Sequence, residues 1–224
     1  MNDPIPTKVE AVQSSELIEE IAWQCLVEAV KRFNMSDDRQ TLLCSRNEEA
    51  EPNGGDWAAA NETTIAHRLG FYIECGLRLR KKITDRGPLV VDCEYNRHIY
   101  DRKKLHANNE YLDLVRQAGR NPIPLADRNG DFELFVFPDI IVHERQTNAN
   151  LLIVELKKRT STEQRSWEQR YDEFKLKLFT TAKPNGYGYK LGAWVVVEDN
   201  CVSSMRNLRI VSQYKDGVKT MLVA

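Results

Sequence analysis

The sequence contains no run of 18 or more apolar residues, so no transmembrane helix is expected. Its first ten residues, MNDPIPTKVE, lack the basic segment followed by an apolar stretch that is typical of a secretory signal. The five cysteines are far apart and form no CxxC or Cys/His cluster, which argues against a zinc site. We therefore expect reduced thiols and a cytoplasmic location.

The chain also lacks a strong net charge, because 32 basic and 33 acidic residues leave a balance of −1. This balance argues against a generic polyanion binder. The charges are nevertheless unevenly distributed: residues 1–62 carry 13 acidic and 5 basic residues, and the remainder carries 20 and 27. The basic excess in the C-terminal part is compatible with a nucleic-acid-binding face, and equally with ordinary solvated surface charge.

Hydrophobic periodicity predicts an α/β fold. Helices are predicted at 14–34, with Ser14 or Ser15 as N-cap, at 61–82, with Asn61 as N-cap, and at 161–182. Strands are predicted at 89–97, 136–142, 151–156 and 191–197, followed by a strand-like tail. Residues 45–60 are rich in turn-forming residues and predict a loop. Residues 98–128 form a charged insert with a short helix at 108–119 that ends at Gly119.

Several of these segments carry an apolar stripe that predicts their buried face. In the first helix the stripe is Leu17, Ile21, Cys25 and Val30, and in the second it is Ile65, Leu69, Tyr72 or Ile73, and Leu77. In the third it is Trp167, Tyr171, Phe174 and Leu178, which we assign to the core rather than to a base-stacking platform.

Two of the aliphatic strands contain charged residues, which burial normally disfavours. If they form an antiparallel hairpin in which Asp139 faces Glu155, paired positions sum to 294 and the hairpin centre is Thr147. Thr147 lies in the polar stretch RQTNA, which is suited to a turn. Because alternate side chains share a face of a strand, Glu155, Lys157 and Asp139 would then converge on one side of the sheet.

Two carboxylates that converge repel each other unless a cation lies between them. Carboxylate oxygens are hard ligands suited to Mg²⁺ or Mn²⁺, and a nearby lysine can orient a water or contact a phosphate. This grouping favours metal-assisted hydrolysis of a phosphodiester.

The motif formed by Pro138-Asp139 and, after 15 residues, Glu155-Leu156-Lys157 resembles that of the PD-(D/E)xK nuclease superfamily. The predicted order of elements over 61–197 is also similar to its restriction-endonuclease-like core of helix, three strands, helix and strand. That core has a mixed sheet with an antiparallel start, here preceded by an extra N-terminal helix. The resemblance leads us to divide the chain into an N-terminal extension, 1–60, and a nuclease-like domain, 61–224, with 98–128 as an insert.

The resemblance implies a metal-dependent nuclease, most readily a DNA endonuclease. Asp139 and Glu155 would ligate Mg²⁺ (or Mn²⁺) together with the backbone carbonyl of Leu156, and Lys157 would position the attacking water or stabilise charge on the phosphate. Glu62 would hold the metal or its waters, with Glu94 as the competing candidate. The expected partner is nucleic acid, and a homodimer is compatible because many such nucleases pair to cut two strands.

Each of these residues also has a structural interpretation. Glu62 is equally explained as a first-turn acid that favours the helix dipole, and Glu94 as a strand end that turns to solvent. Asp172, Lys175 and Leu176 resemble the pattern of the superfamily's helix after the lysine, but Asp172 and Lys175, one helical turn apart, are equally a solvated pair. His67 and His143 are interpreted as surface or hydrogen-bonded histidines, although His143 shares the face of Asp139 and would be placed for a substrate contact.

Two other functions stay open beside the nuclease. One is a module with weak or lost catalysis that binds nucleic acid or a protein partner. The other is an interaction protein without a nucleic-acid role, favoured only by the near-zero net charge.

Overall fold

The computed structural model has a mixed α/β fold built on a six-stranded, mostly antiparallel sheet, in the order β1-β7-β8-β9-β10-β11. It describes residues 8–43, 61–80, 89–94, 97–98, 101–102, 104–117, 119–120, 123–124, 131–144, 149–158, 166–183, 186–200 and 205–222. The strands of the sheet are β1 (Leu89–Cys93), β7 (Ile140–Glu144), β8 (Asn150–Lys158), β9 (Leu191–Asn200), β10 (Met205–Lys215) and β11 (Val218–Met221). None of the described helices is long and apolar enough to cross a membrane.

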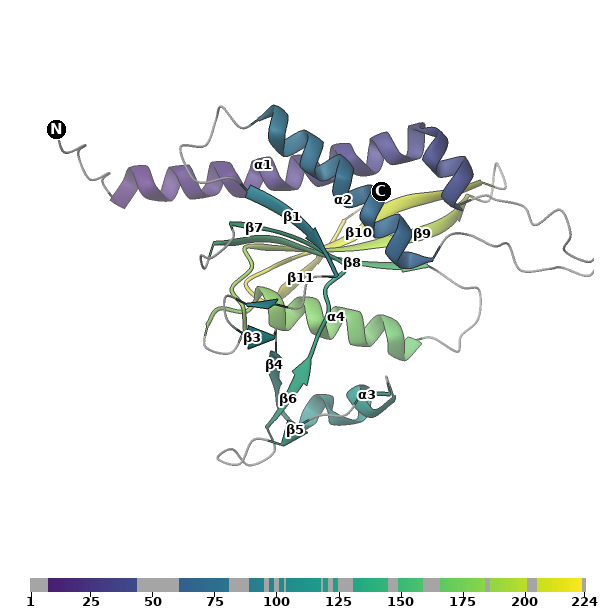
Figure 1. Ribbon diagram of the computed structural model, residues 1–224. Helices are drawn as coiled ribbons and strands as arrows, with labels where there is room; N and C mark the ends of the chain where they lie inside the picture. The colour runs from purple at the N-terminus through teal and green to yellow at the C-terminus, as the bar shows by residue number, and fades with distance from the viewer. Residues whose placement is uncertain are drawn as a thin grey trace, which may run out of the picture.

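Helices cover both faces of this sheet (Figure 1). One face packs against α1 (Lys8–Met35) and α2 (Glu62–Leu79), and the other against α4 (Ser166–Thr180). The alternation of side chains along β8 divides it between two cores: Leu152, Val154 and Leu156 pack toward α1 and α2, and Ile153 packs toward α4. Glu155 and Lys157 have the parity of Ile153 and therefore belong to the α4 face.

The predicted hairpin register is confirmed. β7 and β8 are antiparallel, and the pairs Ile140–Val154, Ile141–Ile153 and Val142–Leu152 all sum to 294. A register shift follows at His143, which pairs with Asn150. Continuing the regular part of this ladder by one pair places Asp139 opposite Glu155.

The connection from β8 to β9 differs from the others because these two strands are parallel. A parallel pair cannot be closed by a tight turn, and here α4 makes the crossover. Because of this crossover, α4 covers the sheet face that carries Glu155 and Lys157. Polar side chains of α4 therefore contact those of β8.

The sequence correctly predicted α2, including its N-cap and its buried face. The Asn61 side chain accepts a hydrogen bond from Thr64 N at 2.8 Å, as an N-cap should. All of the predicted stripe is buried, namely Ile65, Leu69, Tyr72, Ile73 and Leu77. The helix is three residues shorter than predicted, because it ends at Leu79.

The start of the first helix was wrong. α1 begins at Lys8, so Ser14 and Ser15 lie inside the helix and not at its N-cap position. The stripe is confirmed for Ile21, Cys25 and Val30, but Leu17 is half exposed at 49%. This helix packs against α2, β8 and β10, so it contributes directly to the core beneath the sheet.

Other boundaries also differ from the prediction. The strand predicted at 136–142 begins only at Ile140, because Val136–Asp139 cross from β6 (Phe132–Phe135) to β7. The strand predicted at 89–97 ends at Cys93, and the strands of the C-terminal tail are confirmed as β10 and β11. The third predicted helix begins at Ser166, with Tyr171 and Phe174 buried and Leu178 half-buried. The side chain of Trp167 and the loop predicted at 45–60 lie outside the described residues.

The insert predicted at 98–128 lies outside the main sheet, beyond α4 (Figure 1). It contains the short strand β3 (Asp101–Arg102), which pairs with β2 (Arg97–His98). It also supplies β4 and β5, which flank β6 from outside the insert in a three-stranded sheet of order β4-β6-β5. The bounds of the remaining elements are a π-helical turn after α1 (Arg39–Leu43), β4 (Lys104–Ala107), a 3₁₀ turn (Asn109–Tyr111), α3 (Leu112–Gln117) and β5 (Ile123–Pro124). Gly119 adopts a φ of 64° just after α3, as its predicted role in ending that helix requires.

Candidate active site

Asp139 lies directly before β7 and is held by the backbone of the neighbouring strands. Its Oδ2 accepts a hydrogen bond from Leu156 N at 2.6 Å, and its backbone carbonyl accepts one from Glu94 N at 3.1 Å. Burial raises the pKa of Asp139 to about 6, although the positive charge of Lys175 and the hydrogen bond from Leu156 oppose the rise. The carboxylate is thus fixed in position but costly to ionise.

Glu155, in the middle of the predicted motif, is buried with 2% of its surface exposed. Its Oε2 receives the ammonium of Lys175 at 2.6 Å, but its Oε1 is buried without a hydrogen-bond partner among the described residues. Burial raises the pKa of Glu155 well above the ordinary value, an effect that Lys175 opposes and that the charges of Asp139 and Asp172 reinforce.

Lys175 comes from α4 and is the cation of this buried cluster. Its Nζ lies 2.6 Å from Glu155 Oε2 and 3.0 Å from Asp172 Oδ1. Burial alone would lower the pKa of Lys175, but the charges of Glu155, Asp172 and Asp139 outweigh it and raise the pKa. The ammonium therefore stays charged and faces three carboxylates.

Lys157 occupies a second, more open position at the end of β8. Its Nζ lies 3.6 Å from Glu62 Oε2 and 3.3 Å from Glu168 Oε2, so the lysine lies between α2 and α4. Burial lowers the pKa of Lys157, but the carboxylates of Glu62, Asp172 and Glu168 raise it overall. Glu62 is fixed in turn because its Oε1 accepts a hydrogen bond from Lys158 N at 2.9 Å.

Glu94 lies at the edge of the same region. Its side chain is exposed and accepts a hydrogen bond from Thr63 Oγ1 at 2.8 Å. Its backbone has a φ of 51°, which is uncommon for a residue other than glycine and concentrates at functional sites. Glu62 and Glu94 are the two candidates for an acidic residue that holds the metal or its waters. Glu62 contacts Lys157, and the backbone N of Glu94 donates a hydrogen bond to the backbone of Asp139.

The four predicted residues Asp139, Glu155, Lys157 and Glu62 thus converge where β7, β8, α2 and α4 meet. Among the described residues, however, no group of three or more acidic, histidine or cysteine side chains is arranged to hold a metal. This does not conflict with a magnesium site, because Mg²⁺ is usually held by one or two carboxylates, waters and substrate phosphates.

Sequence reasoning gave too little weight to the part of the site that α4 supplies. Asp172 and Lys175 matched the superfamily's helix pattern but were not assigned to the site, and the alternative of a solvated pair is wrong because both are buried, at 7% and 8% exposure. A signal was present: Lys175 lies four residues after Tyr171 and three before Leu178, and so falls on the apolar stripe of the helix. Glu168, which contacts Lys157, lies three residues before Tyr171 and therefore falls on the same stripe.

Two histidines, His67 and His143, were considered as site residues from the sequence. His143 is buried, and its Nε2 lies 2.9 Å from Asp92 Oδ2 of β1, as predicted for a hydrogen-bonded histidine. The register shift after Val142 ends its regular alternation with Asp139. His67 is exposed on α2.

Comparison with known proteins gives no relative from which a function could be transferred: no protein-family model, no curated protein and no solved structure matches the chain. The functional argument therefore rests on the residues and their geometry.

Proposed function

We propose that the chain is a metal-dependent nuclease that hydrolyses phosphodiester bonds, most readily those of DNA. The observation that carries this proposal is the position of Asp139 beside β8, where its carboxylate accepts a hydrogen bond from Leu156 N, between Glu155 and Lys157, with Glu62 reaching Lys157 from α2. The order α2, β1, β7, β8, α4, β9, with its antiparallel start and parallel β8–β9 pair, supports a restriction-endonuclease-like core.

The donor groups suit a divalent cation of the Mg²⁺ or Mn²⁺ type. Glu155 Oε1 is a buried oxygen without a partner among the described residues, and burial raises the pKa of both Glu155 and Asp139. A cation near them would offset the cost of ionising both groups. Asp139, Glu155 and the carbonyl of Leu156 would hold the metal, and Glu62 would hold it or its waters. When bound, the metal would lower the pKa of a water and stabilise charge on the phosphate.

Lys157 is suited to act on the substrate because its ammonium is charged and only partly buried. Three carboxylates raise its pKa, so it cannot readily serve as a neutral general base near pH 7. The role that fits best is that of a fixed positive charge, which orients a water through a hydrogen bond or stabilises the phosphate as negative charge develops.

One observation favours the alternative of a binding module with weak or lost catalysis. Lys175 already neutralises Glu155 and Asp172 by contacts of 2.6 and 3.0 Å, so the acidic cluster has a counter-charge without any metal. A cluster stabilised in this way could persist as a purely structural ion-pair network.

Cleavage assays separate the two. Plasmid and single-stranded DNA are incubated with Mg²⁺ or Mn²⁺ and with wild type, Lys157→Ala or Lys31→Ala, the last removing an exposed lysine on α1. The nuclease proposal expects metal-dependent cleavage by wild type and Lys31→Ala, and a loss on the order of 100-fold or more in Lys157→Ala. Absence of cleavage of every substrate, or equal activity of Lys157→Ala, would contradict it.

A further inference from the structure

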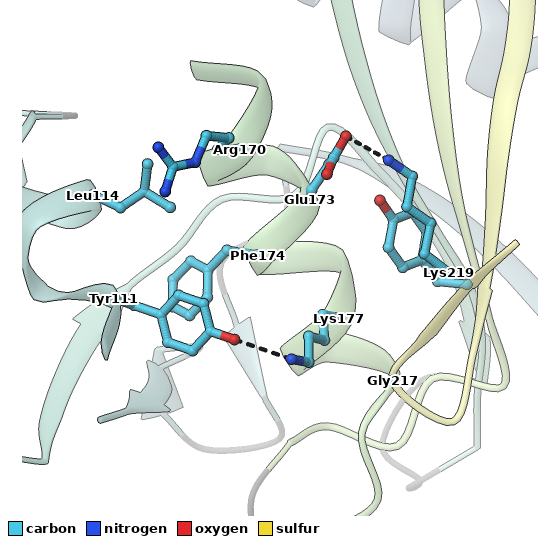
Figure 2. Close-up of a pocket in the computed structure, with 9 residues that line it drawn as sticks. Tyr111, Leu114, Arg170, Glu173, Phe174, Lys177, Gly217 and Lys219 are labelled. Atoms are coloured by element: carbon cyan, nitrogen blue, oxygen red, sulfur yellow. Dashed lines mark hydrogen bonds and ion pairs between the residues drawn. The ribbon is translucent and has the colours of Figure 1, made fainter. Parts of the chain in front are cut away.

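A groove of about 320 Å³ runs along one side of α4 (Figure 2), and neither Asp172 nor Lys175 is among the residues that line it. Arg170, Phe174 and Lys177 of α4 form its floor, since residues three, four and seven apart share one side of a helix. The insert supplies one wall through Tyr111, and the turn between β10 and β11 supplies the other. Segments far apart in the sequence therefore build it together.

The groove has more positive than negative charge. Arg170, Lys177 and Lys219 line it, and Glu173 is its one acidic residue. Lys219 Nζ lies 2.6 Å from Glu173 Oε1, so these two charges largely cancel. Arg170 and Lys177 supply the remaining charge, and they lie two helical turns apart, about 10 Å along the axis.

An aromatic pair lies between these two cations. The rings of Tyr111 and Phe174 stack with centroids 4.3 Å apart and an interplanar angle of 28°. Phe174 is buried beneath, and Tyr111 is half-buried. Lys177 Nζ contacts the Tyr111 hydroxyl at 3.0 Å, which holds the ring in place and brings the ammonium to its edge (Figure 2).

Tyr214 of β10 closes the groove and is only 2% exposed. Burial raises the pKa of its hydroxyl, and a hydrogen bond with the Ser212 side chain opposes the rise.

We propose that this groove binds a nucleotide unit, with the base against Tyr111 and the phosphate at Arg170 or Lys177. A flat aromatic platform flanked by cations is the chemistry by which proteins hold single-stranded nucleic acid, because every base has a π-face and every unit carries a phosphate. An acidic peptide would use the cations but not the stacked rings. The unit can come from a single strand that crosses the groove or from a free mononucleotide.

This inference does not depend on hydrolysis at Asp139 and Glu155. Binding is measured with excess chelator, so that no metal-dependent cleavage occurs. The probes are a fluorescently labelled oligothymidylate, followed by anisotropy, and thymidine monophosphate, followed by calorimetry. If the nuclease proposal fails, the groove should still bind both or either of the probes. If the groove proposal fails, metal-dependent cleavage of plasmid should still be observed.

The informative variants are Lys177→Glu and Arg170→Ala, with Lys31→Glu as control. Lys31→Glu reverses an exposed charge on α1, across the sheet from the groove, and so reproduces the change in net charge made by Lys177→Glu. We expect wild type and Lys31→Glu to bind alike, and Lys177→Glu and Arg170→Ala to bind more weakly and with a smaller salt dependence, since a phosphate contact is lost.

Two substitutions of Tyr111 test the stacking. Tyr111→Phe keeps the ring and should retain most of the affinity, whereas Tyr111→Leu removes the aromatic face and should weaken binding by about tenfold. Binding of the oligonucleotide alone would identify a strand as the source, and binding of both probes would identify the single nucleotide as sufficient. The proposal is overturned if wild type binds neither probe, or if Lys177→Glu and Tyr111→Leu, shown to be folded by circular dichroism, bind as wild type does.

Discussion

Lys175 Nζ lies 2.6 Å from Glu155 Oε2, although the two residues belong to α4 and β8 and both side chains are buried. A buried charge without a partner is strongly disfavoured, so each residue depends on the other. The same ammonium lies 3.0 Å from Asp172, and its charge also acts on Asp139. Lys175 is therefore the internal counter-charge of the acidic cluster.

Replacing Lys175 by methionine should be strongly destabilising, because it leaves Glu155 and Asp172 buried without their cation. We expect a loss of about 3–5 kcal/mol in the free energy of unfolding, measured by urea denaturation. The exposed control Lys31→Met should change it by about 0.5 kcal/mol or less. Adding Glu155→Gln to Lys175→Met should recover part of the loss, and a single Lys175→Met variant as stable as wild type would exclude the structural role.

The stability of the metal-free protein should depend on Asp139 with a definite sign. Because its pKa rises to about 6 on folding, the native state binds more protons than the unfolded state between about pH 4 and 6. The stabilising contribution of Asp139 to the free energy of unfolding is thus present below about pH 4 and is lost as the pH rises through 6. The loss is at most about 3 kcal/mol. Glu155, whose pKa is also raised, acts in the same direction.

Asp139→Asn isolates this contribution because the amide oxygen can still accept the hydrogen bond from Leu156 N. We expect the stability of Asp139→Asn relative to wild type to increase between pH 4 and 7, measured by urea denaturation in the presence of a chelator. A constant difference across this range would show that Asp139 ionises at its ordinary pKa.

Glu62 and Glu94 should contribute unequally to cleavage. Glu62 contacts Lys157 at 3.6 Å and the backbone N of Lys158 at 2.9 Å, whereas the exposed side chain of Glu94 contacts Thr63. Glu62→Gln should therefore lower the rate of DNA cleavage by about tenfold or more, and Glu94→Gln should lower it less. A larger effect of Glu94→Gln than of Glu62→Gln would show that Glu94, and not Glu62, is the acidic residue that holds the metal or its waters.

Gly70 marks a close approach between α2 and β1. A Cβ at this position would lie 2.8 Å from Cys93 Sγ, closer than real Cβ atoms come to such a neighbour. Gly70→Ala should therefore be destabilising by about 1–3 kcal/mol, although alanine favours a helix over glycine by about 1 kcal/mol. In a Cys93→Ala background the sulfur is absent, and the same substitution should become neutral or stabilising. Thermal denaturation of wild type, Gly70→Ala, Cys93→Ala and the double variant would show whether the effect of Gly70→Ala on stability changes sign.

The sequence predicted best those features that local chemistry determines. The hairpin register followed from the supposition that Asp139 faces Glu155, which puts the hairpin centre at Thr147 in a polar stretch, and it is confirmed by the pairs from Ile140–Val154 to Val142–Leu152. The Asn61 cap followed from a side chain that satisfies a free N–H at the helix start. The alternation of side chains then placed Glu155 and Lys157 on the same face of β8.

Features that depend on tertiary contacts were predicted poorly. α1 continues back to Lys8, past Ser14 and Ser15, so a residue suited to capping does not by itself begin a helix. The spacing of Lys175 put it on the apolar stripe of its helix, but the sequence does not show that the crossover of α4 above β8 buries Lys175 and Asp172 against Glu155. The insert carries short strands whose pairing depends on distant residues, as in the pairing of β4 with β6.

The most direct test of the central claim is Mn²⁺ binding by calorimetry to wild type, Asp139→Asn and the control Asp113→Asn, which changes an exposed carboxylate of α3. We predict that wild type and Asp113→Asn bind one ion with similar affinity. Residues that only orient a metal ligand typically change metal affinity by roughly 10- to 100-fold when mutated. Because Asp139 is proposed to bind the metal directly, Asp139→Asn should lower the Mn²⁺ affinity by more than this. A wild-type protein that binds no Mn²⁺, or an Asp139→Asn variant that binds it equally well, would contradict the account.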